Sequence, residues 1–211
     1  LVIKVLIYAI TFFFIIPLIS CRDSQKQSFE IVNKSYINNF ELLQDNSKSE
    51  TTISINSPRA IIDTLTNDIE IFDSLIHIYN DRGNNIQLKS GNSSLENTNN
   101  IIRVYNNVHI SLLDTKDSYI KTDELIWDLN ISQINLNNPL LINFKNTTIT
   151  SSKGIYNIDS SILNLINNNF NRDIYNNDGK KLYKIHILSD NARWYKYDNS
   201  LEFSSNQKQV E

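Results

Sequence analysis

The chain has 211 residues, and its 20 Lys and Arg against 23 Asp and Glu give a formal net charge of −3. This length allows one or two domains. The charge balance, with no long basic run and no basic patch interleaved with aromatic residues, excludes nucleic acid as a partner. Four Gly and three Pro are few for a chain with many turns, so we expect Asn to occupy most left-handed and Asx-turn positions.

The first twenty residues are almost wholly apolar, with Lys4 as their single charge, and they end in Leu18-Ile19-Ser20-Cys21. This ending resembles a bacterial lipobox, in which a small residue precedes a Cys that receives diacylglycerol. The chain has one Cys and therefore no disulfide partner for it, so we expect Cys21 to be lipidated. The alternative is a retained transmembrane helix, for which the length is borderline. Either way, residues 1–21 are an anchor outside the fold.

Residues 22–50 are polar and mixed in character. Ile37, Phe40 and Leu43 could share one face of a short helix, but a tether leading into the first strand fits equally well, and we assign a tether. From residue 51 to residue 211 the pattern is strand after strand, with apolar and polar residues alternating. The segment from Phe170 to Lys181 is polar and indicates an inserted loop.

The strongest signal is an internal repeat after residue 50, in which a hydroxyl residue is followed three positions later by a small or apolar one. The five copies are Ser57-Pro58-Arg59-Ala60, Ser90-Gly91-Asn92-Ser93, Thr122-Asp123-Glu124-Leu125, Ser151-Ser152-Lys153-Gly154 and Ser189-Asp190-Asn191-Ala192. Such a strand-turn-strand unit cannot bury its apolar face alone. We therefore expect the copies to stack into one all-β domain of antiparallel strands with a continuous apolar interior.

Alternation of side chains along each strand turns one face into this interior and the other toward water. If the two walls close tightly the apolar stripe is a core, and if they splay apart it is a groove for an apolar ligand. The residues expected to form the walls, and thus to contact a lipid in the second case, are Ile53, Ile55, Ile69, Ile71, Ile86, Leu88, Ile102, Val104, Ile120, Trp127, Ile134, Leu136, Phe144, Ile149, Ile185, Ile187, Leu201 and Phe203.

The sequence carries no pattern for catalysis, a cofactor or a metal. His77, His109 and His186 each lie between apolar residues of a strand, so alternation points them away from the interior and from one another. The pair Asp123 and Glu124 belongs to a repeat position that varies between copies, which is a poor place for a general acid. Nucleophile-elbow, phosphate-loop and dinucleotide motifs are absent from the sequence. We therefore predict that the chain is not an enzyme.

The order of anchor, tether and repeated Ser-x-x-Ala/Gly units resembles the LptC family of the lipopolysaccharide-transport machinery, whose bridge and outer-membrane components share the repeat. The resemblance covers about Thr51 to Phe203. Its most telling stretches are 55–60, 78–83, 120–127 and 149–154. It implies an open, twisted β-jellyroll of many short antiparallel strands.

The resemblance also implies a function at the periplasmic face of the inner membrane. The family takes lipopolysaccharide from an inner-membrane ABC transporter and passes it to an LptA-like bridge protein, with sheet edges joined end to end. Well-known members keep a transmembrane helix, whereas this chain shows a lipobox. Two alternatives remain at this point: an assembly lipoprotein whose closed β core only presents edges to partners, and a carbohydrate-active enzyme using acids such as Asp123, Glu124 or Asp190.

Overall fold

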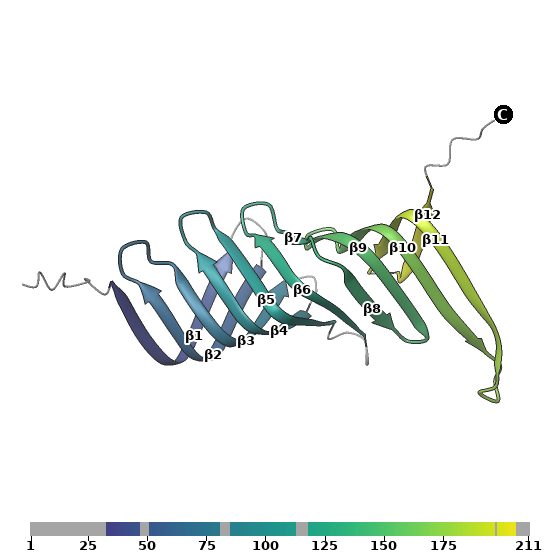
Figure 1. Ribbon diagram of the computed structural model, residues 1–211, viewed down its shortest axis with the longest axis horizontal. Helices are drawn as coiled ribbons and strands as arrows, with labels where there is room; N and C mark the ends of the chain where they lie inside the picture. The colour runs from purple at the N-terminus through teal and green to yellow at the C-terminus, as the bar shows by residue number, and fades with distance from the viewer. Residues whose placement is uncertain (1–32, 47–50, 81–84, 113–117, 197, 206–211) are drawn as a thin grey trace, which may run out of the picture. The chain divides into compact units, whose positions relative to one another are not determined.

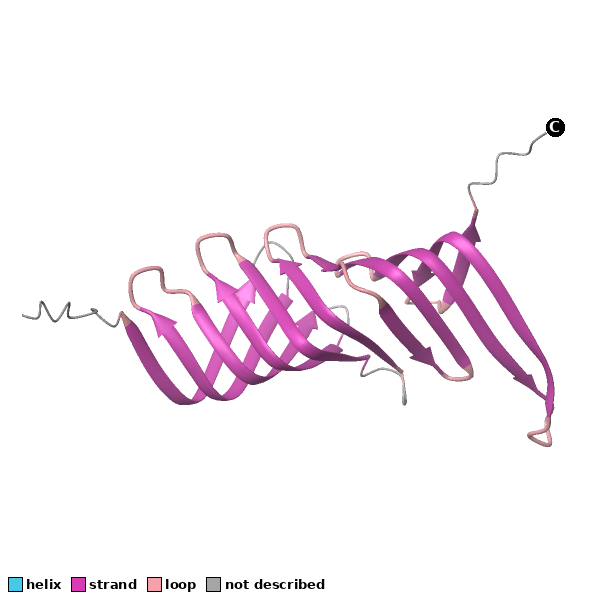
Figure 2. Cartoon of the chain, in the orientation of Figure 1, coloured by secondary structure: helices cyan, strands magenta, loops and turns pink. Residues whose placement is uncertain are grey.

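The computed structural model describes residues 33–46, 51–80, 85–112, 118–196 and 198–205, and every regular element in these ranges is a β-strand (Figure 2). The all-β prediction is therefore confirmed. The strands are β1 (Lys34–Asn46), β2 (Thr51–Asp63), β3 (Ile69–Asn80), β4 (Asn85–Glu96), β5 (Ile101–Leu112), β6 (Tyr119–Asp128), β7 (Gln133–Leu136), β8 (Leu140–Phe144), β9 (Thr147–Asn157), β10 (Ile162–Tyr175), β11 (Lys181–Tyr195) and β12 (Ser200–Ser204). Among these residues there is no helix that could cross a membrane.

All twelve strands belong to one antiparallel sheet in which neighbours in sequence are neighbours in space. The exception is the position shared by β7 and β8, which both lie between β6 and β9. These two short strands are the halves of one interrupted strand. The interruption contains Pro139, which has no amide to donate to a neighbouring strand.

Each long strand bends near its middle, so that one half of the strand lies in front of the other (Figure 1). In β2 the buried residues Thr51, Ile53, Ile55 and Ser57 follow a period of two, but the next buried residue is Ala60. This step of three reverses which side chains face inward, as expected where extra residues interrupt a ladder and bend the strand. The sheet is therefore folded along a line that crosses all its long strands.

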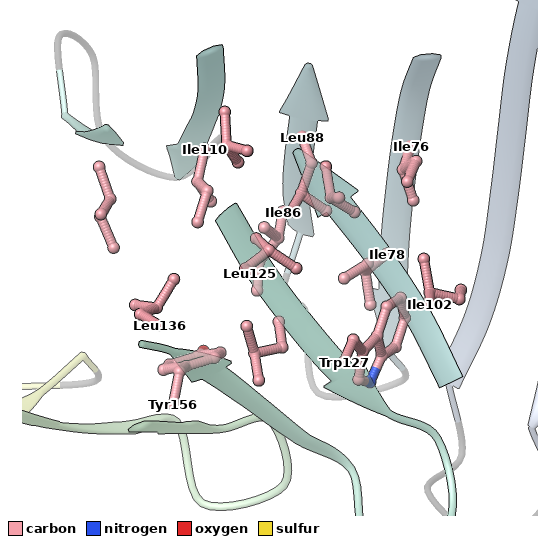
Figure 3. Close-up of a cluster of buried hydrophobic side chains, with 14 of the residues drawn as sticks. Ile76, Ile78, Ile86, Leu88, Ile102, Ile110, Leu125, Trp127, Leu136 and Tyr156 are labelled. Atoms are coloured by element: carbon pink, nitrogen blue, oxygen red, sulfur yellow. The ribbon is translucent and has the colours of Figure 1, made fainter. Parts of the chain in front are cut away.

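The bend divides the sheet into two layers. Layer A contains β8, the first halves of β2, β4, β6, β9 and β11, and the second halves of β1, β3, β5 and β10. Layer B contains β7, β12 and the remaining halves. The layers meet through side chains: the ring centroids of Phe144 and Trp194 lie 5.6 Å apart, and those of Phe170 and Phe203 lie 5.2 Å apart. The interior between the layers is one continuous apolar cluster (Figure 3).

The five repeat copies found in the sequence mark this bend in every second strand. Their hydroxyl residues are all buried, and in three copies the hydroxyl oxygen donates to the carbonyl two residues later: Ser57 to Arg59 at 2.7 Å, Ser90 to Asn92 at 2.8 Å and Thr122 to Glu124 at 3.4 Å. Ser74 and Ser90 also join neighbouring strands at 2.8 Å. The side chains thus replace ladder hydrogen bonds that the bend interrupts. The repeat lies within strands rather than in turns between them, which differs from the strand-turn-strand prediction.

In the intervening strands the bend uses residues with positive φ. These are Asn39 in β1, Asp73 in β3, Asn106 and Asn107 in β5 and Asn167 in β10. Asn and Asp tolerate the left-handed region better than other residues with a side chain. The prediction that Asn fills most left-handed positions is confirmed for the described residues.

In four of the five repeat copies a small residue follows the bend, and Leu125 takes this position in the third copy. Each of these small residues has a larger partner on the neighbouring strand: Ala60 pairs with Ile71, and Ser93 pairs with Val104. At Gly154, a Cβ would lie 3.2 Å from Leu165 Cδ2 and 3.3 Å from Leu136 Cδ1. A side chain at this position would push these leucine side chains aside by a few tenths of an ångström, so a glycine fits the packing at residue 154.

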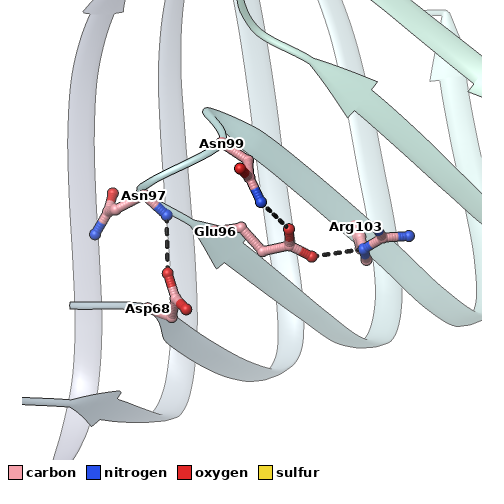
Figure 4. A network of polar contacts seen from close by, with 5 residues as sticks. All are labelled: Asp68, Glu96, Asn97, Asn99 and Arg103. Carbon is pink, nitrogen blue, oxygen red and sulfur yellow. Dashed lines mark hydrogen bonds and ion pairs between the residues drawn. The ribbon is translucent and has the colours of Figure 1, made fainter. Parts of the chain in front are cut away.

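The turns at the rim of layer B are linked to one another by polar side chains (Figure 4). Asp68 Oδ1 accepts the amide of Asn97 at 3.0 Å, which joins the β2–β3 turn to the β4–β5 turn. Glu96 accepts from Arg103 Nε at 2.6 Å and from Asn99 Nδ2 at 3.1 Å, and these bonds lower the pKa of Glu96. Asn130 Nδ2 donates to Asn99 O at 3.2 Å and so ties in the next turn. The many Asn residues therefore connect successive repeats.

Two sequence-based assignments differ from the structure. Lys34–Asn46 lies in the segment assigned as a tether, but it forms the edge strand β1, and Phe40 of this strand is buried. The predicted inserted loop from Phe170 to Lys181 is instead the end of β10, a short turn and the start of β11. In both cases polar residues obscure the alternation of apolar and polar side chains, because these strand segments have few neighbouring strands to bury them. Cys21 and the anchor lie outside the described residues.

Candidate functional site

The apolar interior is the feature that every expected wall residue shares. Of the eighteen, thirteen are buried, while Phe144, Ile185, Ile187, Leu201 and Phe203 are partly buried and pack against the others. None of them points into solvent as a fully exposed side chain. The structure thus brings the whole predicted set together on one inner surface.

Sequence reasoning omitted several members of the same inner surface. They are Ile76, Ile78, Val108, Ile110, Leu125, Ile142, Tyr156, Leu163, Leu165, Phe170 and Trp194, all buried. The alternation around His77 and His109 could have identified the first four, and the equivalence of Trp194 with Trp127 could have identified the last. Tyr156 and Leu163 become recognisable only from the register that pairs them with each other.

The interior is closed between the layers. Ile53, Ile55, Ile71, Ile76 and Ile102 have no exposed surface at all. A small cavity of about 20 Å³ lies between the layers, lined by Ile86, Ile110 and Ile120 of layer A, by Ile134, Leu136, Tyr156, Leu163 and Trp194 of layer B, and by Ser161 and Lys196. That volume is on the scale of one water molecule. In this conformation the inner surface therefore packs as a core.

The cavity lies beside a weakly paired connection within the sheet, between β6 and the position shared by β7 and β8, which we call the β6 seam. There β6 pairs with β7 through Ile126–Asp128 and with β8 through Tyr119–Lys121, three residues in each case. By contrast, β5 and β6 pair at nine positions. Between the two short ladders the contact is a side-chain bond from Thr122 Oγ1 to Pro139 O at 3.2 Å. Parting the sheet at the β6 seam breaks fewer backbone hydrogen bonds than parting it at the β5–β6 ladder.

A shallow groove of about 610 Å³ lies on the outer surface at the same seam, lined by residues that include His109, Lys121, Asp123 and Pro139. The His109 ring stacks on Tyr119 with centroids 5.1 Å apart, and Lys121 Nζ lies 4.9 Å from the centre of that tyrosine ring. Partial burial lowers the pKa of His109, and the positive charges of Lys121 and Lys89 lower it further. This outer face carries positive charge and aromatic rings rather than a catalytic arrangement.

The acidic residues Asp123 and Asp190, considered above for a carbohydrate-active enzyme, lie on separate strands. Asp123 lies on β6 and Asp190 on β11, with the β7/β8 position, β9 and β10 between them. At about 4.7 Å per strand that places the two acids on the order of 19 Å apart along the sheet, too far to act on one glycosidic bond. Among the residues that the structure describes, no group of His, Cys, Asp and Glu could hold a metal ion.

A folded sheet of repeats around one apolar interior is thus the class of protein that the structure defines. The family described as "Lipopolysaccharide-assembly, LptC-related" matches residues 1–168. The chain belongs to this family. It therefore takes part in lipopolysaccharide transport, in a family whose partners are lipopolysaccharide and the other Lpt proteins of the periplasm.

Among solved structures, the chain is similar to LptH from Pseudomonas aeruginosa, the LptA-homologous periplasmic component of its lipopolysaccharide transport device. The identity is 12% and the TM-score 0.43, over 58% of this chain and 86% of that one. No curated protein matches the chain.

Proposed function

We propose that the chain holds the acyl chains of lipopolysaccharide between its two layers and relays the lipid from the inner-membrane ABC transporter to a periplasmic bridge protein. The observation that carries the proposal is the unbroken apolar inner surface, which runs from β1 to β12. Membership in the LptC-related family supports the same role. In this proposal the eighteen wall residues contact lipid, and the N-terminus, lipidated at Cys21 or retained as a helix, holds the chain at the inner membrane.

The energetics of acyl chains fit such an interior. Exposing one methylene to water costs about 0.8 kcal/mol, so a chain of a dozen carbons costs on the order of 10 kcal/mol. A carrier must replace nearly all of this apolar contact along the whole path. Because lipid in a membrane and lipid in the interior have similar free energies, directional flow needs an energy source, which we assign to the ATPase of the transporter.

The closed interior requires the layers to separate before acyl chains can enter, and we place this opening at the β6 seam. The cavity lined by Ile120, Leu136 and Tyr156 lies next to it, so a starting volume already exists there. The seam is held by three paired residues on each side of the Pro139 interruption. When lipid enters, contacts between the layers are replaced by contacts with acyl chains, which keeps the apolar surface covered.

The two free edges of the sheet are the proposed docking points for the neighbouring proteins. No described strand pairs with the outer edge of β1, and β12 covers β11 only at Asn191–Tyr195. Edge strands with unpaired backbone groups are templates for β-augmentation. Each neighbour would then extend the sheet and continue the apolar interior.

A photo-crosslinking experiment tests the relay. Ile86 and Gln87 are adjacent in β4, but Ile86 is buried in the interior while Gln87 lies on the outer face, beside His77. With the reconstituted transporter and ATP, a crosslinker at Ile86 should capture lipopolysaccharide and one at Gln87 should not. Equal capture at the two positions, or capture at neither, would contradict the proposal.

A second candidate is an assembly protein whose closed core binds no lipid and whose edges alone contact partners. The closure of the interior, with a cavity near 20 Å³, favours it. The two functions differ in their response to a hydrophobic fluorescent probe. A lipid carrier stripped of lipid binds the probe in competition with lipopolysaccharide, whereas an assembly protein pairs with its partner but binds no probe.

A further inference from the structure

The hairpin formed by the ends of β10 and β11 extends beyond the rest of the sheet (Figure 1). Pairing between β9 and β10 ends at Arg172, and the amide of the next residue, Asp173, donates to Asn146 O at 3.1 Å. On the other side, β12 begins to pair with β11 only at Asn191. Residues 174–184, which we call the hairpin arm, therefore have no described strand on either side.

Internal contacts fix the hairpin arm although it has no neighbours. Its turn is closed by hydrogen bonds from Asn176 N to Lys180 O at 2.9 Å and from Gly179 N to Asn176 O at 3.1 Å. Asn176 Oδ1 accepts the amides of Asp178 and Lys180 at 3.1 and 2.8 Å. The φ of Gly179 is +75°, which a glycine adopts without strain. An isolated two-stranded ribbon is marginally stable in water, so these turn contacts and the continuation of the arm into the sheet contribute to its stability.

The arm and its base carry positive charge in an acidic protein. The net charge of residues 172–184 is +2, whereas that of the whole chain is −3. The basic residues are Arg172, Lys180, Lys181 and Lys184, and the acidic ones are Asp173 and Asp178. Lys181 is paired with Asp173 at 2.5 Å. The other three basic side chains are exposed and make no ion pair among the described residues.

Large apolar and aromatic side chains are exposed among these charges. Leu182 is 58% exposed, Tyr183 57% and Tyr175 44%. Lysines alone would be explained as protection of a sheet edge against aggregation. Protection against aggregation does not explain the two exposed tyrosines and the leucine beside these lysines, because exposed apolar side chains favour association of an edge with other molecules. Tyrosine and lysine side chains that flank an apolar residue are instead suited to a bilayer surface, because the rings lie at the headgroup level and the lysines reach outward to phosphates.

We propose that the hairpin arm is a membrane-contacting element that docks on a bilayer surface rich in anionic phospholipid. The arm meets the bilayer with its turn end, because Leu182 and Tyr183 lie on opposite faces of β11. Lys180 and Lys184 contact lipid phosphates, while Leu182, Tyr183 and Tyr175 enter the interfacial region. The arm lies beyond residue 168, where the match to the LptC-related family ends. The inference does not depend on the lipid relay, because it concerns the exposed arm beyond the paired part of the sheet and not the closed interior.

Fluorescence in nanodiscs tests the proposal on the full chain. An environment-sensitive fluorescent amino acid replaces Leu182, and in a control protein it replaces Thr150, which is exposed on the outer face of β9. With discs of phosphatidylcholine plus phosphatidylglycerol, the reporter at 182 should shift to the blue and be quenched by brominated lipid. Discs of phosphatidylcholine alone, or high salt, should remove the effect, and the reporter at 150 should stay in water.

A charge variant supplies the second part of the test. Lys180→Gln with Lys184→Gln should lower insertion of the arm by on the order of tenfold to thirtyfold. The matched control, Lys89→Gln with Lys121→Gln, removes the same charge from the outer face near the β6 seam and should leave insertion unchanged. A reporter at 182 that stays in water with anionic discs overturns the proposal. So does an equal shift in neutral discs, or a shift that appears only when a partner protein is added.

Discussion

At the residue scale, the buried Ser and Thr residues at the bend contribute to the fold through their hydroxyl hydrogen bonds. The Oγ of Ser57 accepts the amide of Arg59 at 3.1 Å and shares its proton between the carbonyl oxygens of Phe72 and Arg59. These contacts replace backbone bonds, so the loss of the hydroxyl leaves buried groups unpaired. This explains the hydroxyl residue that opens the first three copies of the repeat, whereas Ser151 and Ser189 of the last two copies both bond the side chain of Asn168.

Substitution of Ser57 by Ala should lower the free energy of unfolding by about 1–3 kcal/mol, because the buried carbonyl of Phe72 loses its side-chain donor. Ser54→Ala in the same strand is the matched control, since Ser54 lies on the outer face. It should change stability by less than about 0.5 kcal/mol. Urea denaturation of both variants measures the difference, and equal losses for Ser57→Ala and Ser54→Ala would show that the bend does not need the hydroxyl.

The stability of the protein should fall in mild acid because of His109. Burial and the nearby Lys121 and Lys89 keep the pKa of His109 below its ordinary value of about 6.5. As the pH falls through 6.5, the unfolded chain therefore binds this proton first, and the free energy of unfolding decreases until the folded pKa is passed. Above that window the group has no effect.

An NMR titration checks this assignment. Lys121→Gln removes one positive charge and should raise the pKa of His109 toward its ordinary value. His109→Gln should reduce the loss of stability between neutral and mildly acidic pH. The electrostatic account would be contradicted if the pKa of His109 were the same in Lys121→Gln as in the wild type. It would also be contradicted if His109→Gln lost more stability in mild acid than the wild type.

At the scale of elements, alternation along the chain predicted a succession of strands from β2 onward and eighteen of their inward residues, but not the eleven others named above. It could not predict β1, because an edge strand with one neighbour leaves Tyr36 and Leu43 exposed and its pattern is diluted. It also missed the β10–β11 hairpin, whose outer ends have no layer to cover them. The repeat itself was recognised, but sequence spacing cannot distinguish a turn between two strands from a bend within one.

The β6 seam should control access to the interior. A disulfide introduced by Lys121→Cys with Leu141→Cys, which are partners across the seam, should reduce lipopolysaccharide capture at Ile86 severalfold, and reduction should restore it. The control disulfide, His77→Cys with Gln87→Cys, joins partners across the well-paired β3–β4 ladder and should have no effect. Equal inhibition by both disulfides, or by neither, would mean that lipid does not enter at the seam.

At the scale of the whole domain, the two layers are packed against each other, and the proposed function requires them to separate. The bend line and the linked turns at the rim of layer B are the parts that hold each layer together during such a change. The interior could be identified from the sequence because alternation is a local property. Its closure could not, because it depends on how far apart two layers lie, which no local pattern records.

The distance between the layers tests this account most directly. Spin labels carried by unnatural amino acids at Gln87 in layer A and Asn135 in layer B, both on outer faces, report the separation by pulsed electron resonance. Labels at Thr52 and Gln87, both in layer A, serve as the control. Loading with lipopolysaccharide should lengthen the first distance and leave the second unchanged. An inter-layer distance that stays constant while lipopolysaccharide is bound would contradict the proposal that the lipid lies between the layers.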